Sequence, residues 1–204
     1  MRYHTFQMVR NETKSLGGKQ HTIAVLGSHS ALEVCSGAKK QGFQTLVVVE
    51  KGRDKTYAQY FKAKGNLGCV DEVVELDNFK DLLKDEVQKK LLAKNAIFVP
   101  HRSFEVYVNN YDEIEKKFKV PMFGNRFLLR TEERSEDLNQ YDLLKKAEIK
   151  YPKRFNKPEE IDRLVIVKVS ERERSFERAF FLAHDIYSYR RQSQTKLTEG
   201  KITK

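Results

Sequence analysis

The sequence predicts an α/β fold in which helices cover a parallel β-sheet, and residues 21–50 carry most of this prediction. Two continuous apolar runs, at 22–26 and 43–49, flank a segment whose apolar residues recur at spacings of three and four. Such runs around an amphipathic helix are typical of a β-α-β unit whose sheet is buried on both faces. Strand-like and helix-like segments continue to alternate up to residue 104, which indicates a layered α/β domain.

The elements after residue 50 follow from turn residues and hydrophobic periodicity. Asp54 is placed to cap a short helix that runs to residue 64, because aspartate accepts hydrogen bonds from the first turn. Tyr57, Tyr60 and Phe61 lie at helical spacing there and are predicted to belong to the core. The further elements predicted in this part are a strand at 70–76, a helix at 79–92 and a short strand at 96–99.

A second domain, which looks incomplete, is predicted in the last part of the chain. An apolar strand at 164–169 is followed by a dense charge run at 170–178 and by a possible returning strand at 180–183. The predicted organisation is an N-terminal arm at 1–20, an α/β domain at 21–125 and an incomplete domain at 126–204.

The composition restricts the class of protein. The net charge is +10, but the basic residues are interspersed with acidic ones, which favours a solvated surface or phosphorylated small substrates over nucleic acid. No run approaches the length of a membrane span, so we expect a soluble, cytoplasmic protein. Cys35 and Cys69 are far apart in the sequence and support neither a disulfide framework nor a metal site.

Polar clusters directly follow several of the predicted strands. They are Gly27-Ser28-His29-Ser30, Pro100-His101-Arg102-Ser103, Gly124-Asn125-Arg126 and Lys168. Parallel neighbouring strands would place the first three at one edge of the sheet, facing a common cleft. A glycine, hydroxyls and an imidazole at a helix start would suit a phosphate or another small anion. Each cluster alone is weak, because loops are polar in any protein, but two histidines close to serines favour a functional site.

The order of short motifs along the chain resembles that of one enzyme family. The motifs are G-S-H-S at 27–30, G-A-K-x-x-G-F at 37–43, K-G-R at 51–53, P-H-x-S-F at 100–104, V-P-x-F-G-N-R at 120–126, L-L-R-x-E at 128–132, P-E-E-I-D at 158–162 and V-I-V-K at 165–168. This set resembles the ATP-grasp ligases of archaeal-type purine biosynthesis that formylate AICAR with formate and ATP, the FAICAR synthetases. The resemblance extends over nearly the whole chain.

The resemblance implies a fold, an activity and a set of ligands. The fold is a pre-ATP-grasp parallel-sheet domain followed by the beginning of an ATP-grasp domain. The activity is the ATP-dependent conversion of AICAR and formate to FAICAR in IMP biosynthesis, through a formyl phosphate intermediate. The implied ligands are AICAR, formate, ATP and Mg²⁺ (or Mn²⁺), with no nucleic acid and no membrane as partner, and the implied assembly is a homo-oligomer.

The resemblance also implies roles for individual residues. His29 and Ser103 match residues that contact AICAR, and the residues expected beside them are Gly27, Ser28, Ser30 and Asn125. Lys168 matches the ATP-grasp lysine that contacts the nucleotide phosphates as a point charge. The carboxylates that hold the metal ion lie in the C-terminal part of the family fold, so no metal site is expected in this chain.

The chain departs from the family pattern at three places. The glycine of P-H-G-S-F is Arg102, the tryptophan of L-R-W-E is Thr131, and the glycine-rich loop after the lysine is S-E-R-E-R-S-F-E-R-A-F-F. Arg102 either distorts the pocket or adds a cation that pairs with phosphate. In the loop, either ATP binding is lost or cationic side chains replace the backbone contacts; these side chains are Arg172, Arg174 and Arg178.

Three hypotheses for the function follow from the sequence. The first is an ATP-dependent ligase of purine synthesis, although the chain alone would lack the metal-binding part of such an enzyme. The second is a non-catalytic paralog that binds a purine-pathway nucleotide as a sensor or as a partner subunit. The third is a basic nucleic-acid-binding protein, which would bind with a steep salt dependence.

Overall fold

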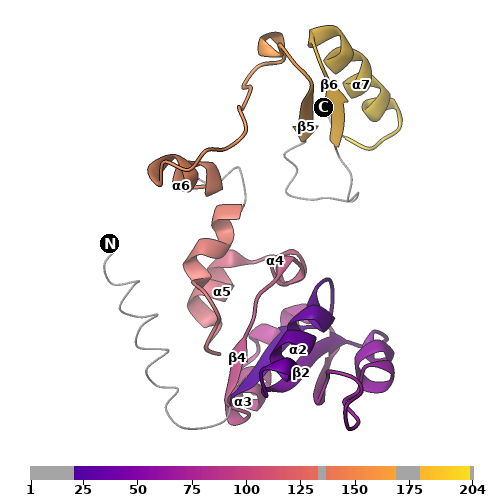
Figure 1. Cartoon of the computed structure of the whole chain (residues 1–204), viewed down its shortest axis with the longest axis vertical. Coiled ribbons are helices and arrows are strands. Elements are labelled where there is room, and N and C mark those ends of the chain that lie inside the picture. Colours follow the sequence, from indigo (N-terminus) through magenta and orange to yellow (C-terminus); the bar gives the residue numbers. More distant parts are fainter. Residues whose placement is uncertain (1–20, 133–136, 169–179, 203–204) are drawn as a thin grey trace. The chain divides into compact units, whose positions relative to one another are not determined.

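The computed structural model of the chain describes residues 21–132, 137–168 and 180–202 (Figure 1). The chain divides into two compact units, with the boundary after Arg130. The predicted domain limits, 21–125 and 126–204, stay a prediction, because compactness alone does not show that each part folds independently. Within the described residues, none of the helices combines the length and the hydrophobicity that a membrane crossing requires.

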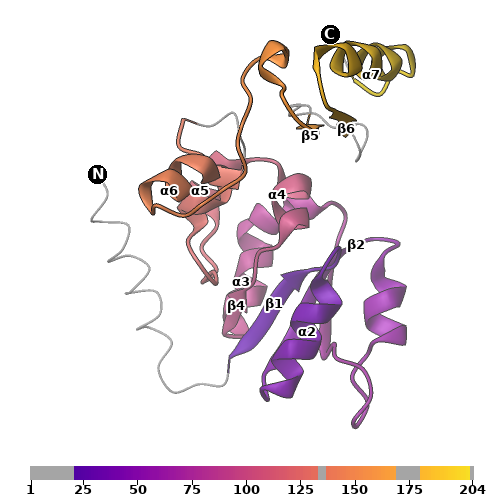
Figure 2. The same ribbon diagram turned by 45° about the horizontal axis from the view of Figure 1, so that its top comes forward.

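The first unit is built on a parallel sheet with the strand order β3-β2-β1-β4, of which β2, β1 and β4 are labelled in Figure 2. Its strands are β1 (Thr22–Leu26), β2 (Gln44–Glu50), β3 (Glu72–Leu76) and β4 (Ala96–Phe98). Phe98 also forms a parallel bridge to Met122, which places the segment around residue 122 beyond β4. Because all the paired strands run in the same direction, their carboxyl ends meet at one edge of the sheet.

Helices cover both faces of this sheet, because alternate residues of each strand point to opposite faces. Val25 and Val47 pack in one core with α2 (Ala31–Lys40) and with Tyr57 of η1 (Thr56–Tyr60). Leu26 and Leu46 belong to a second, larger core. The helices that contribute to it are η2 (Phe79–Leu83), α3 (Asp85–Ala93), α4 (Arg102–Val108) and α5 (Tyr111–Lys117). The predicted layered α/β domain is therefore confirmed.

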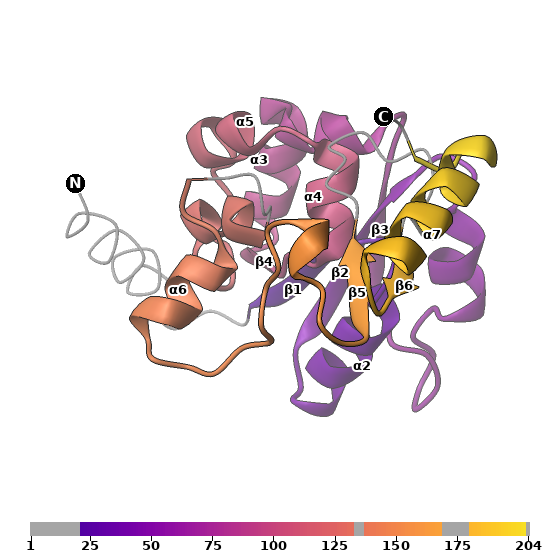
Figure 3. The ribbon, with the colours of Figure 1, turned by 90° about the horizontal axis from the view of Figure 1, so that it is seen from above.

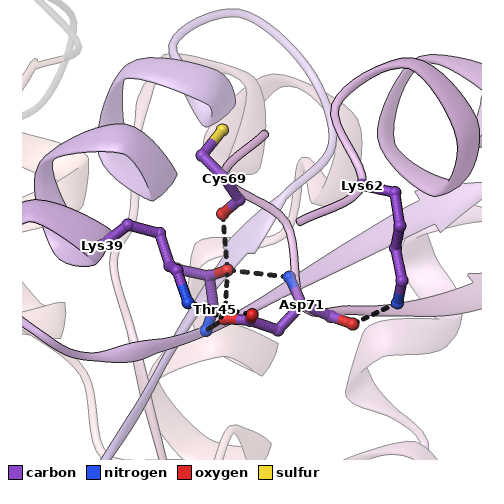
Figure 4. Close-up of polar contacts among 5 residues, drawn as sticks. All are labelled: Lys39, Thr45, Lys62, Cys69 and Asp71. Carbon is purple, nitrogen blue, oxygen red and sulfur yellow. Dashed lines mark hydrogen bonds and ion pairs between the residues drawn. The ribbon is translucent and has the colours of Figure 1, made fainter. Parts of the chain in front are cut away.

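A polar network ties β2 to the start of β3 (Figure 4). The carboxylate of Asp71 accepts hydrogen bonds from the Thr45 backbone N–H at 2.8 Å and from Lys39 Nζ at 2.9 Å. The Thr45 hydroxyl, which is fully buried, donates to the Cys69 carbonyl at 2.6 Å, and Lys62 donates to the Asp71 carbonyl. These bonds satisfy polar groups at the amino-terminal edge of the sheet, opposite the edge where the strands end.

The second unit contains an antiparallel hairpin of β5 (Val165–Lys168) and β6 (Phe180–Ala183). Helix α7 (Ile186–Thr198) lies along the hairpin (Figure 3), and the Phe181 and Tyr189 rings are 5.7 Å apart. The helix η3 (Arg126–Glu132) spans the boundary between the units, and the described part of the second unit also contains α6 (Gln140–Lys146) and η4 (Pro158–Glu160). The returning strand predicted at 180–183 is confirmed.

Two helix predictions need correction. The helix expected at 54–64 begins at Asp54 but ends with the π-helical turn η1 at Tyr60, and Tyr57 is buried whereas Tyr60 and Phe61 are 77% and 42% exposed. The core prediction is wrong for these two aromatic residues because a π-helical turn is wider than an α-helical one, so Tyr60 does not share the face of Tyr57, and Phe61 follows the end of the turn. The helix expected at 79–92 is divided, since Lys84 adopts an extended conformation between η2 and α3.

Candidate functional site

The loops that follow β1 and β4 meet at the carboxyl edge of the sheet, as the sequence predicted. Ala24 of β1 pairs with Phe98 of β4, so the two strands end side by side. The Ser103 hydroxyl donates a hydrogen bond to the Ser28 hydroxyl at 3.2 Å. The His29 and His101 rings are stacked, with their centroids 6.0 Å apart. Two hydroxyls and two imidazoles from distant parts of the sequence therefore form one polar cluster.

Gly27 allows β1 to turn sharply between two buried neighbours. Its N–H donates to the Val48 carbonyl at 2.7 Å, which continues the β1–β2 pairing for one residue. A Cβ atom at this position would lie 2.6 Å from Val49 Cγ1 and 3.0 Å from Tyr57 Cε2. Gly27 is thus required for close packing beneath the loop, and this packing brings Ser28 to the edge of the sheet.

His101 joins the two loops through both of its ring nitrogens. Nε2 donates to the Leu26 carbonyl at 2.8 Å, because a carbonyl oxygen can only accept, and Nδ1 accepts from the Ser103 N–H at 3.2 Å. This pair of bonds selects the neutral tautomer with its proton on Nε2. Burial lowers the pKa of His101, the hydrogen bond to Leu26 opposes this effect, and the nearby His29 lowers the pKa further. The imidazole also caps the first turn of α4.

His29 is the exposed member of the cluster. Its φ of 42° lies in the left-handed region, which is uncommon for residues other than glycine and points to functional strain. Its Nδ1 is 2.6 Å from the Ser30 hydroxyl. Ser30 is the N-cap of α2, a fully described helix, but its side chain accepts no hydrogen bond from the first turn. The Ala31 N–H of that turn instead donates to the Ser28 carbonyl at 3.0 Å.

Asn125 lies at the same edge but has a local structural role. The bridge between Phe98 and Met122 places residues 124–125 just beyond the end of β4. The Asn125 carboxamide oxygen accepts from the Phe127 N–H at 3.0 Å and so caps the start of η3. Among the described residues, this side-chain oxygen thus accepts from η3, whereas Ser28 and Ser103 are hydrogen-bonded to each other.

Lys168 lies in the other unit, at the end of β5. It pairs across the hairpin with Phe180, and its side chain is exposed on the same face as Ile166 and Leu182. An ammonium group therefore stands at the end of an exposed apolar strand face. The other expected ATP contacts, Arg172, Arg174 and Arg178, lie outside the described residues.

Arg53 belongs to the motif K-G-R, to which the sequence assigned no role, and the structure places it at the carboxyl end of β2. Its guanidinium donates to the Tyr107 hydroxyl at 3.1 Å and lies over the rings of Tyr107 and Phe79 at 5.0 and 5.5 Å. The hydrogen bond with Tyr107 raises the pKa of Arg53, although partial burial opposes this effect. The sequence feature that could have identified Arg53 is a turn with basic residues directly after a strand. This turn follows β2 in the same way that the loop of Gly27 follows β1.

The described part of the chain does not supply a metal centre. Among those residues, no group of three or more His, Cys, Asp or Glu side chains could hold a metal ion. The cluster around Ser103 consists of hydroxyls and imidazoles, and Mg²⁺ prefers carboxylates and phosphates. No chemical step is therefore assigned to a metal ion here.

Comparison with known proteins places most of the chain in one family. Residues 23–155 match the family described as Protein of unknown function (DUF1246). A protein of Methanopyrus kandleri named 5-formaminoimidazole-4-carboxamide-1-(beta)-D-ribofuranosyl 5'-monophosphate synthetase is 43% identical over 181 residues, which are 89% of this chain and 47% of that relative. The protein of the same name from Methanothermobacter thermautotrophicus is 41% identical over 182 residues, with the same two coverages of 89% and 47%.

One solved structure supports the same grouping. The crystal structure of an IMP biosynthesis protein PurP from Thermococcus kodakaraensis aligns with a TM-score of 0.52 and 28% identity, covering 78% of this chain and 48% of that chain. The chain thus spans about half the length of the curated relatives that it matches. These similarities confirm the predicted resemblance, and the structure confirms the predicted α/β class with its parallel-sheet domain.

Proposed function

We propose that this chain, which belongs to the DUF1246 family, binds AICAR and takes part in its ATP-dependent formylation to FAICAR in IMP biosynthesis. The observation that carries the proposal is the similarity to curated FAICAR synthetases over most of the chain. The polar cluster at the ends of β1 and β4 lies within the matched region, and its groups suit a small polar nucleotide.

In this proposal the loops after β1 and β4 bind AICAR. The exposed imidazole of His29 and the hydroxyl of Ser103 contact the substrate, because both groups donate and accept hydrogen bonds as ribose and carboxamide groups require. The hydroxyl of Ser28 orients that of Ser103 by a hydrogen bond, and the hydroxyl of Ser30 is hydrogen-bonded to the His29 imidazole. Gly27, which has no side chain, allows the loop to pack closely against the sheet. Asn125 borders the site from the neighbouring turn.

The proposed reaction has two balanced steps. A formate oxygen attacks the γ-phosphorus of ATP, so that ADP leaves and formyl phosphate forms. The AICAR amine then attacks the formyl carbon, inorganic phosphate leaves, and the nitrogen loses one proton. Because the first step transfers a phosphoryl group, the site requires positioning and cationic charge more than a protein nucleophile.

The hairpin of the second unit is proposed to contact ATP. Lys168 supplies a point charge for phosphate oxygens, and the exposed apolar side chains of Ile166 and Leu182 lie on the same strand face. The divalent ion, Mg²⁺ or Mn²⁺, would enter with ATP, since such ions are commonly held by substrate phosphates together with one or two carboxylates. We further propose that the protein is cytoplasmic and forms a homo-oligomer. Analytical ultracentrifugation checks the oligomeric state.

A second candidate function is a non-catalytic nucleotide sensor or partner subunit. It is favoured by one feature of the sequence: the segment after Lys168, S-E-R-E-R-S-F-E-R-A-F-F at 170–181, contains no glycine. Without glycine, backbone N–H groups approach phosphates less readily. This candidate predicts that AICAR binds and that ATP does not.

Calorimetric titration with AICAR, and separately with Mg-ATP, tests both candidates. The informative variant is His29→Asn, because asparagine tolerates the left-handed backbone at residue 29 while the imidazole is removed. Binding of both ligands, with AICAR affinity reduced about 10-fold in His29→Asn, supports the ligase. Binding of AICAR alone supports the sensor, and binding of neither ligand contradicts both.

A variant of Lys168 separates the two ligand sites. Lys168→Met removes the ammonium group of an exposed side chain and is expected to weaken Mg-ATP binding without changing AICAR binding. Lys157→Met, in a matched exposed position of the same unit, is the control and should change neither affinity. If Lys168→Met and Lys157→Met bind Mg-ATP with equal affinity, the proposed contact between Lys168 and ATP is wrong.

A further inference from the structure

We infer that Arg53 binds the 5′-phosphate of the nucleotide substrate at the carboxyl edge of the sheet. The inference rests on the proposed function for the identity of that nucleotide. The sequence contains Arg53 as the last residue of the motif K-G-R but assigns it no role, and its position beside the site comes from the structure.

The topology places Arg53 beside the proposed AICAR site. β1 and β2 are neighbouring parallel strands, so the turn after β2 ends at the same edge as the loop of Ser28. Tyr57, which follows Arg53 in this turn, packs against the position of Gly27. On the other side, Arg53 is hydrogen-bonded to Tyr107 of α4, the helix that carries Ser103. Arg53 thus contacts the helix of Ser103 directly and is linked to the loop of Gly27 through Tyr57, four residues further along the chain.

Ser103 and Tyr107 lie one helical turn apart on the same face of α4. Side chains four residues apart on a helix have their Cβ atoms about 5–6 Å apart. The Tyr107 hydroxyl lies 3.1 Å from the Arg53 guanidinium. A nucleoside monophosphate is long enough for its sugar to contact Ser103 while its phosphate reaches Arg53.

The guanidinium of Arg53 is held in place but keeps donors for a ligand. The rings of Tyr107 and Phe79, themselves stacked at 4.9 Å, lie beside it and fix its plane. One of its nitrogens donates to the Tyr107 hydroxyl. Within the described part of the chain, no carboxylate forms an ion pair with it, and Glu50 acts only at longer range. Such a preorganised and exposed guanidinium matches the geometry of phosphate oxygens.

Several neighbouring groups do not supply positive charge. His101 is held neutral by its two hydrogen bonds, and Ser28 and Ser103 are uncharged. Lys51, in the same turn as Arg53, is paired with Asp77. Arg102, the residue before Ser103 in α4, also carries a guanidinium, and Arg53 is the one that the Tyr107 and Phe79 rings hold in place.

The test compares AICAR with its riboside, which lacks only the phosphate, in calorimetric titrations of the full chain. Arg53→Gln should weaken AICAR binding about 10- to 100-fold, as expected for the loss of a charged hydrogen-bonded pair, and leave riboside binding unchanged. Arg53→Lys should lose less affinity, because it keeps the charge but not the fork of donors. Lys40→Gln, which removes one positive charge at the far end of α2, is the control and should bind both ligands normally.

The outcomes separate this inference from the proposed function. If the unmodified chain binds AICAR and Arg53→Gln binds it equally well, the phosphate role is wrong and the AICAR site stands. An equal loss of AICAR and riboside affinity would mean that Arg53 only holds the loop, which also overturns the inference. Failure of the unmodified chain to bind either ligand overturns the proposed function and this inference with it.

Discussion

The imidazole of His101 connects the carbonyl of Leu26, at the end of β1, with the N–H of Ser103, in the first turn of α4. The two distances are 2.8 Å from Nε2 and 3.2 Å to Nδ1. Because each ring nitrogen has a fixed role, a single side chain sets the spacing of the two loops that carry His29 and Ser103. The neutral imidazole is therefore a positioning group for the proposed site.

Replacing His101 should reduce both stability and ligand affinity. His101→Ala leaves the Ser103 N–H without its partner, and we expect the free energy of unfolding in urea to fall by about 1–3 kcal/mol. His101→Asn should lose less, because asparagine is a good N-cap. Asn110→Ala, which removes the N-cap of α5, is the control and should lower stability by about 1 kcal/mol without changing AICAR affinity. Unchanged AICAR affinity in His101→Ala would contradict the positioning role.

The stability of the chain should also depend on the protonation of His101. Its pKa is lower in the folded chain than its usual value of about 6.5, so the unfolded chain binds more protons in this range. The contribution of His101 is therefore complete above pH 6.5 and is lost as the pH falls from there through the folded pKa. Urea unfolding measured between pH 5 and 8 should show that the unmodified chain loses stability more steeply on acidification than the His101→Asn variant does. Parallel profiles would contradict this assignment.

Gly27 and Gly37 form a matched pair for testing close packing. Gly27→Ala places a methyl group against Val49, Val47 and Tyr57, and we expect a loss of about 1–3 kcal/mol in the free energy of unfolding. Gly37 lies inside α2 with no atom near its added Cβ, so Gly37→Ala should raise stability by about 0.5–1 kcal/mol. Thermal unfolding that shifts in the same direction for both variants would contradict the packing role of Gly27.

The network around Asp71 should contribute more stability than an exposed ion pair. Burial raises the pKa of Asp71, but the hydrogen bonds from Lys39 and Thr45 outweigh this effect and hold the pKa below its usual value. Asp71→Asn should lower the free energy of unfolding by about 1–3 kcal/mol at pH 7. Asp77→Asn, which breaks an exposed pair with Lys51, should cost less than about 1 kcal/mol.

The effect of Asp71→Asn should depend on pH in a defined direction. A carboxyl group with a lowered folded pKa stabilises the chain above its unfolded pKa of about 3.9, and this contribution is lost as the pH falls below that value. The difference between Asp71→Asn and the unmodified chain should therefore shrink between pH 4 and pH 2. A difference that stays constant over this range would show that packing, rather than charge, dominates.

Ser28 and Ser103 should act as a coupled pair in ligand binding. Their hydroxyls share a hydrogen bond of 3.2 Å, so each orients the other. Ser103→Ala should weaken AICAR binding by about 3- to 10-fold. Ser28→Ala should reduce the AICAR affinity less when it is introduced into Ser103→Ala than when it is introduced into the unmodified chain. A double-mutant cycle measured by calorimetry checks the coupling, and strictly additive losses would mean that the two serines act separately.

Local sequence patterns were sufficient for the layered fold. The apolar runs at 22–26 and 43–49 became β1 and β2, and the parallel order followed from the helix between them. The same logic placed the loops of Ser28 and Ser103 at one edge, since parallel strands must end together. Patterns failed where the type of helix decided the outcome: Tyr60 and Phe61 have α-helical spacing, but the turn formed there is the π-helical η1, and both side chains are exposed.

Tertiary structure decided which polar groups face one another. That His101 is neutral depends on the Leu26 carbonyl, 75 positions earlier in the sequence, and that Arg53 lies at the site depends on Tyr107, 54 positions later. No local pattern encodes such contacts, because they arise from strand order and from helix packing over the sheet. The sequence by itself determined the elements, the family and the loops that form the site; the packed chain determined the hydrogen-bond partners, the charge states and the side chain proposed to meet the phosphate.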